Sequence, residues 1–134
     1  MQQPANHSEF TEALAQVGKR VKSPGGLKFS EQFIDLLSLI NQDYVVEYAP
    51  GMGVTSQMAM RQNPRDYQAL EQSPLIKEYW KHCAHLNPEK LRDAAPWQTG
   101  IEEQYVTKVY GENFMLHLTE QQRNATLSET HRIL

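Results

Sequence analysis

The chain has 134 residues, a formal net charge of −3 at pH 7, 40% hydrophobic residues and one cysteine, Cys83. This length supports one domain of ordinary size. The negative net charge does not favour nucleic acid as the main partner. No apolar run reaches the roughly 18 residues of a membrane-spanning helix. With one cysteine and no signal-like N-terminus, a cytoplasmic protein without a disulfide framework is the simplest interpretation.

The first part of the chain, residues 1–43, is predicted to be a helical segment. Residues 8–20 are compatible with a helix whose N-cap is Ser8, and Ser23-Pro24-Gly25-Gly26 interrupts it. A second helix is predicted over residues 30–40, because apolar side chains recur there at helical spacing. These side chains are Phe33, Leu36, Leu37 and Ile40.

Strands and helices alternate in the rest of the chain. The first strand is predicted over residues 44–48. The helix after the next turn should end near Asn63-Pro64, since a residue before proline disfavours the helical region. A second strand is predicted over residues 67–71. A helix over residues 73–86 follows, with Ser73-Pro74 as its N-cap and first position.

The pattern weakens over residues 87–103, where we expect a loop after a helix start at Asn87-Pro88. Residues 106–111 are rich in β-forming side chains and are predicted to be a third strand. The last helix is predicted from Thr119 to the end of the chain. Strands that alternate with crossover helices form a parallel sheet, so the predicted fold class is α/β.

The most informative stretch is Val45–Thr55, where a short apolar run ends in an acid and a glycine-bearing turn leads into a helix. Glycines at positions 51 and 53 let the backbone approach a ligand closely. Glu71 lies 20 residues after Gly51 and closes the second apolar run. An acid there accepts hydrogen bonds from ribose hydroxyls in doubly wound folds. The turn and the acid together suggest a site for an adenosine-type cofactor.

These residues resemble the motifs of class I S-adenosylmethionine-dependent methyltransferases. Val45–Thr55 is similar to the first motif of that family, and residues 63–71 are similar to the segment with its second-strand acid. Residues 99–101 and 107–112 resemble the region of its fourth strand, and residues 129–134 resemble a helix end of the family. The resemblance implies a Rossmann-like domain over residues 44–134, truncated to about three or four strands, with S-adenosyl-L-methionine as cofactor.

The resemblance also implies what the turn and the acids do. Glu47 would help to hold the ammonium group of the cofactor, and Glu71 would bind its ribose. The backbone of the turn would pass close to the amino-acid half of the cofactor, at Ala49, Pro50, Gly51 and Gly53. The implied activity is methyl transfer to a small-molecule acceptor that the sequence does not identify. Without the resemblance, Glu47 is also compatible with a solvent-facing strand end and Glu71 with a surface acid.

The chain departs from the family pattern in several places. Ala49 stands where the family has its first glycine, and Asp93 is the one candidate for an acid at the end of a third strand. The chain also stops at Leu134, before the strands that complete the family's sheet. We expect a truncated reading frame, a remnant that pairs with a second chain, or a homodimer that completes the sheet along an open edge.

Two other functions compete with the methyltransferase. One is a non-catalytic remnant or partner protein that keeps the cofactor-binding half of the fold. The other is a nicotinamide-dependent oxidoreductase, which shares the turn and the acid.

Several other residues carry weaker signals. His82-Cys83-Ala84-His85 lacks a second ligand pair, so we expect a solvated helix face and no metal site. Trp80 and Trp97 are predicted to be packing residues. Polar side chains that follow the predicted third strand are compatible with acceptor-binding or catalytic groups and equally with ordinary loop polarity. They are Tyr110, Glu112 and Asn113.

Overall fold

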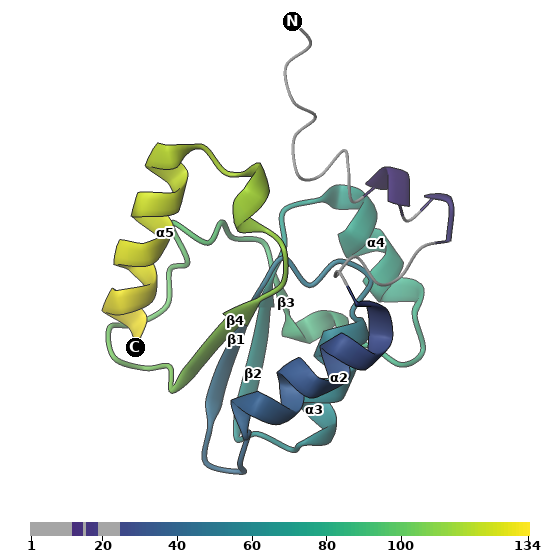
Figure 1. Cartoon of the computed structure of the whole chain (residues 1–134), viewed down its shortest axis with the longest axis horizontal. Coiled ribbons are helices and arrows are strands. Elements are labelled where there is room, and N and C mark those ends of the chain that lie inside the picture. Colours follow the sequence, from purple (N-terminus) through teal and green to yellow (C-terminus); the bar gives the residue numbers. More distant parts are fainter. Residues whose placement is uncertain (1–11, 15, 19–24) are drawn as a thin grey trace, which may run out of the picture.

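A computed structural model describes residues 12–14, 16–18 and 25–134. In this part of the chain four parallel strands form one sheet in the order β3-β2-β1-β4. The strands are β1 (Tyr44–Tyr48), β2 (Asp66–Leu70), β3 (Leu91–Arg92) and β4 (Lys108–Gly111). One face carries α5 (Glu120–Ile133), and the other carries α2 (Gly26–Leu37) and α3 (Val54–Arg61) (Figure 1). The predicted α/β class, a parallel sheet with crossover helices, is confirmed.

Two helices begin where local sequence signals place them. In α4 (Pro74–His82) the side chain of Ser73 accepts a hydrogen bond from the backbone N–H of Ile76, as an N-cap does. The helix α5 begins with a capping box in which the side chains of Thr119 and Gln122 each accept a backbone N–H of the other residue. Both predicted starts are confirmed.

Other helix boundaries differ from the predictions. The helix expected over residues 30–40 is α2, which begins at Gly26 and ends at Leu37 because Ser38 has a left-handed φ of 48°. The helix expected over residues 73–86 ends at His82, where the chain turns to an extended conformation. Of the helix expected over residues 8–20, residues 12–14 and 16 are helical, and the remainder with Ser8 lies largely outside the described residues.

The loop expected over residues 87–103 is wrong in one respect, because it contains β3. Leu91 and Arg92 pair in parallel with Ala69 and Leu70 of β2. A strand of two residues is too short to show an alternating pattern, so its neighbour in the sheet defines it. The expected helix start is the short 3-10 helix η1 (Pro88–Lys90), whose cap is Asn87.

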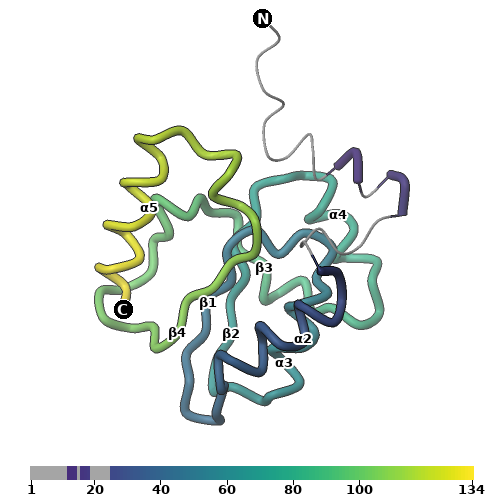
Figure 2. The backbone as a smooth tube through the Cα atoms, viewed as in Figure 1, coloured from purple at the N-terminus to yellow at the C-terminus, as the bar shows by residue number. Residues whose placement is uncertain are grey.

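The sheet separates two apolar clusters, and side chains of the inner strand β1 point into both of them. Val45 packs in the cluster on the side of α2 and α3, and Val46 and Tyr48 pack on the opposite face, where Ile133 of α5 is fully buried. Figure 2 shows the end of α5 beside the loop that leads into β4. Two backbone hydrogen bonds join them. The N–H of Val106 donates to the carbonyl of Ile133, and the N–H of Gln104 donates to the carbonyl of Arg132.

The helix α2 packs directly on the sheet. The ring of Phe33 meets the ring of Tyr110 edge-on, with 5.9 Å between centroids. The ammonium group of Lys108 donates hydrogen bonds to the carbonyls of Leu37 and Ser38 at the end of α2. The division of the chain at residues 43 and 44 stays a prediction.

The two edges of the sheet are formed by β3 and β4. Pairing of a second chain along either edge stays a prediction. Among the described helices, none has both the length and the apolar character that crossing a membrane requires.

Candidate functional site

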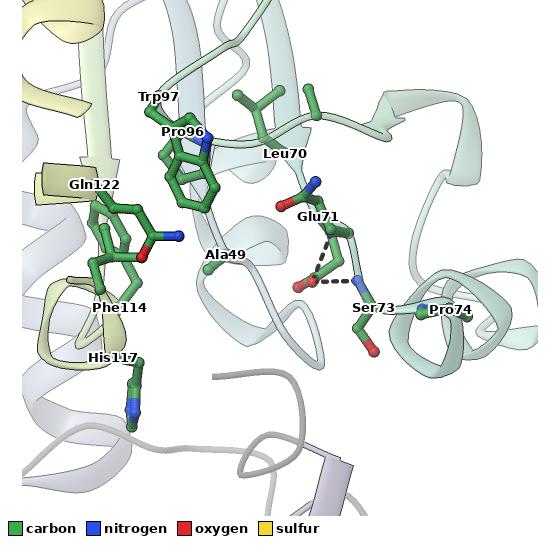
Figure 3. A pocket seen from close by; sticks show the side chains of 13 residues that line it. Ala49, Leu70, Glu71, Ser73, Pro74, Pro96, Trp97, Phe114, His117 and Gln122 are labelled. Carbon is green, nitrogen blue, oxygen red and sulfur yellow. Dashed lines mark hydrogen bonds between the residues drawn. The ribbon is translucent and has the colours of Figure 1, made fainter. Parts of the chain in front are cut away.

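A cavity of about 320 Å³ lies at the carboxyl ends of the strands. Segments that follow all four strands contribute to its wall, and α5 adds Gln122 (Figure 3). In open α/β sheets this edge is the place where ligands bind. Its lining residues are Ala49, Leu70, Glu71, Gln72, Ser73, Pro74, Ala94, Pro96, Trp97, Phe114, His117, Leu118 and Gln122.

The acid of the cavity is Glu71, which directly follows β2. Its Oε1 atom accepts hydrogen bonds from the backbone N–H groups of Gln72, at 3.0 Å, and Ser73, at 2.9 Å. Only 7% of its surface is exposed. The two bonds hold the carboxylate in one orientation at the wall, where Figure 3 shows it across the cavity from Phe114. The site thus contains a preorganised hydrogen-bond acceptor.

Aromatic and apolar side chains form much of the remaining wall. Trp97 and Pro96 come from the loop after β3, and Phe114 comes from the segment after β4. His117 ends the short 3-10 helix η2 (Met115–His117) beside them. A flat apolar wall opposite a fixed carboxylate suits a ligand with an aromatic ring and hydroxyl groups.

The loop that carries Trp97 is fastened to α5 by a charged network. The carboxylate of Glu129 accepts hydrogen bonds from the backbone N–H of Thr99, at 3.0 Å, and from its hydroxyl, at 2.6 Å. Arg132 donates to both oxygens of Glu129 at 2.8 Å and to the carbonyl of Ile101 at 2.7 Å. Hydrogen bonds from Arg132 and Thr99 lower the pKa of Glu129 from 4.5 to about 2.

This network is expected to weaken in acid. Because the pKa of Glu129 is lower in the folded protein, its contribution to stability is present above about pH 5 and is lost as pH falls toward 2. We expect a loss of about 1–2 kcal/mol in the free energy of unfolding, after allowing for solvent around Arg132. Urea unfolding at pH 7, 5 and 3 measures it. In Glu129→Gln this part of the pH dependence should disappear; an unchanged pH profile in that variant would contradict the prediction.

The glycine turn is held tightly by its neighbours. Ala49, Gly51 and Gly53 have left-handed φ values of 52°, 57° and 75°. The indole N–H of Trp80 donates a hydrogen bond to the carbonyl of Gly51 at 2.8 Å. The backbone N–H of Ala49 donates one to the carbonyl of Leu70 at 3.0 Å. Among the residues of the turn, Ala49 lines the cavity.

Glu47 lies inside the core on the side of α2 and α3. Only 2% of its surface is exposed, and its carboxylate accepts hydrogen bonds from the hydroxyls of Thr55, at 2.5 Å, Ser56, at 2.6 Å, and Tyr67. Burial raises the pKa of Glu47. Burial and the nearby Glu47 charge also raise the pKa values of Tyr67 and Tyr110 well above the ordinary range.

The structure therefore brings together some of the predicted site residues and separates others. Ala49 and Glu71 share the cavity wall, whereas Glu47, Pro50, Gly51 and Gly53 are buried next to it and are not lining residues. Which of these six residues contact a cofactor stays a prediction.

The weaker candidates have other surroundings. Tyr110 points into the core, Glu112 accepts a hydrogen bond from Ser30 at 3.3 Å, and Asp93 forms an exposed ion pair with Lys77 at 2.6 Å. None of them lines the cavity. In the described part of the chain no three His, Cys, Asp or Glu residues are grouped to hold a metal ion.

Sequence reasoning missed most of the cavity wall. Trp97 was expected to be a packing residue, and the structure places it, half-buried, at the cavity. Gln72, Phe114, His117 and Gln122 were not singled out. These residues could have been found from their place in the chain, directly after predicted strands. Residues that follow parallel strands meet at one edge of the sheet.

The chain is thus an open parallel α/β sheet with a cavity at its carboxyl edge. No protein-family model matches the chain, and no curated protein sequence matches it. Solved structures do match. A protein described as an S-adenosyl-L-methionine-dependent methyltransferase, from Methanococcus maripaludis, aligns over 100% of this chain with 17% identity and a TM-score of 0.69. A protein described as a methyltransferase from an antibiotic biosynthesis pathway, from Anabaena variabilis, aligns over 86% of this chain with 17% identity and a TM-score of 0.66.

These matches show that the chain has the Rossmann-like fold found in methyltransferases. The aligned region covers 63% of the Methanococcus chain and 43% of the Anabaena chain. This chain thus spans less than two thirds of the length of either structure.

Proposed function

We propose that the chain binds S-adenosyl-L-methionine in the cavity at the carboxyl edge of the sheet and transfers its methyl group to a small-molecule acceptor. The observation that carries the proposal is the fixed carboxylate of Glu71 in a cavity bordered by segments from all four strands. The fold shared with two described methyltransferases supports it.

The residues of the cavity fit the cofactor by chemical type. A carboxylate such as Glu71 is an acceptor for ribose hydroxyls, and Trp97 and Phe114 offer aromatic surface to a purine ring. A volume of about 320 Å³ is within the range of small-ligand sites. The bound cofactor would supply an activated methyl group on its sulfonium. The chain would hold its adenosine part and exclude water from it.

Calorimetric titration with S-adenosylhomocysteine tests this proposal. We expect one site per chain with a micromolar dissociation constant. Trp97 adds a second readout, because its indole lines the cavity and should change fluorescence when the ligand binds. In Trp97→Phe the fluorescence change should shrink to the part that Trp80 contributes through its hydrogen bond to the Gly51 carbonyl of the turn.

A folded, monodisperse sample that gives no heat would reject the methyltransferase proposal. It would favour the second candidate, a non-catalytic remnant or partner protein. The chain aligns with 43% and 63% of the two methyltransferase structures, so parts of their fold lie outside the aligned region.

A further inference from the structure

The buried carboxylate of Glu47 joins the two ends of the glycine turn. Glu47 precedes the turn in β1, and Thr55 and Ser56 follow it in the first turn of α3. Their hydroxyls donate hydrogen bonds of 2.5 and 2.6 Å to the two carboxylate oxygens. These bonds span eight and nine residues and enclose the whole turn, including Ala49 in the cavity wall.

The surroundings of Glu47 leave little room for another partner. The titratable groups that face its carboxylate are Tyr67 from β2, which donates a hydrogen bond, and Tyr110 from β4. The helix α3 contributes hydroxyls, and Tyr67 and Tyr110 belong to an apolar cluster that also contains Phe33 and Ile34 of α2. A buried carboxyl group is stable only when its oxygens are hydrogen-bonded, so these donors make the contact to α3 a strong one.

We infer that Glu47 is a positioning residue, which fixes the glycine turn through the hydroxyls of Thr55 and Ser56 and does not touch the ligand. By holding the start of α3 against β1, it keeps Ala49 at the cavity wall. The inference about ligand affinity rests on the proposed function, whereas the inference about the conformation of the turn does not.

Two ligands distinguish positioning from direct contact. S-adenosylhomocysteine carries an ammonium group, and 5′-methylthioadenosine lacks the whole amino-acid part. Glu47→Gln keeps the volume of the side chain and removes its charge. If Glu47 acts only through the turn, Glu47→Gln and Thr55→Val should show the same pattern of losses over the two ligands, about tenfold for S-adenosylhomocysteine, whose amino-acid half would lie beside the turn. A loss for S-adenosylhomocysteine in Glu47→Gln that Thr55→Val does not share would show direct contact and overturn the inference.

A matched pair of variants tests the connection through α3. Thr55→Val keeps the shape of the side chain and removes the hydroxyl, and Thr55→Ser keeps the hydroxyl. We expect Thr55→Val to weaken S-adenosylhomocysteine about tenfold and Thr55→Ser to stay within about twofold of the wild type. This pair also decides the question if Glu47→Gln does not fold. Equal affinities for the two variants would overturn the inference.

Hydrogen exchange makes the test independent of ligand binding. In Thr55→Val the amides of Ala49 and Gly53, which donate hydrogen bonds to the carbonyls of Leu70 and Pro50, should exchange about tenfold faster than in Thr55→Ser, while those of β2 stay unchanged. If the wild type binds neither ligand, the proposed function fails, and this exchange difference alone supports or overturns the role of Glu47. Equal exchange in the two variants overturns it.

Discussion

Replacing Gly53 with alanine is expected to lower the free energy of unfolding by about 2–5 kcal/mol. The residue has a left-handed φ of 75°, which an alanine adopts with strain. A Cβ atom there would lie 2.7 Å from two side-chain carbons of Leu86 and 3.2 Å from Trp80. Both neighbours are buried in the core and have little room to move. Urea unfolding followed by circular dichroism measures the loss.

Gly26→Ala is the matched control for this prediction. Gly26 has a similar φ of 65°, and nothing lies within 4 Å of the position of its missing Cβ. This variant therefore reports backbone strain without the steric clash, and we expect a loss of about 1 kcal/mol. Equal losses in the two variants would show that the packing around Gly53 does not restrict the turn.

Replacing Glu71 with alanine is expected to weaken S-adenosylhomocysteine binding about 100-fold. The variant removes the fixed carboxylate at the cavity wall, which we assign to the ribose hydroxyls. It also leaves the backbone N–H groups of Gln72 and Ser73 without their acceptor. Glu71→Gln retains an oxygen for these two groups and removes the charge, so it separates ligand binding from the local fold. Calorimetric titration at pH 7 measures the affinities.

Asp93→Ala provides a control at the neighbouring strand. Asp93 also follows a strand of the sheet, but it is exposed, pairs with Lys77 and does not line the cavity. We expect its removal to leave the affinity within about twofold of the wild type. An affinity of Glu71→Ala equal to that of Asp93→Ala would place the ligand elsewhere.

Local signals in the sequence were sufficient for much of the fold. The strand predicted over residues 44–48 is β1, and Ser73 and Thr119 cap the helices they were expected to cap. Caps and turns depend on residues close together in the chain, so a single sequence contains the information. The alternation of strands and helices then made a parallel sheet the expected arrangement.

The short strand β3 and the direction of the Glu47 side chain were decided by tertiary contacts. Leu91 and Arg92 form a strand only because β2 lies beside them. The ligand contact that the resemblance implies for Glu47 stays a prediction, and the structure places its carboxylate among hydroxyl groups of α3 and β2. A sequence pattern gives the position of an acid on a strand, and only the packed neighbours determine what its oxygens bind.

The sequence by itself determined the parallel α/β order, the glycine turn and an acid at the end of the second strand, which the structure places one residue beyond β2. Each follows from residue type, spacing and chain order, which are local properties. Only the tertiary structure decided which side chains line the cavity, because Ala49, Glu71, Trp97 and Phe114 come from segments after four different strands. Their meeting depends on strand order and register, which arise from contacts between residues far apart in the chain.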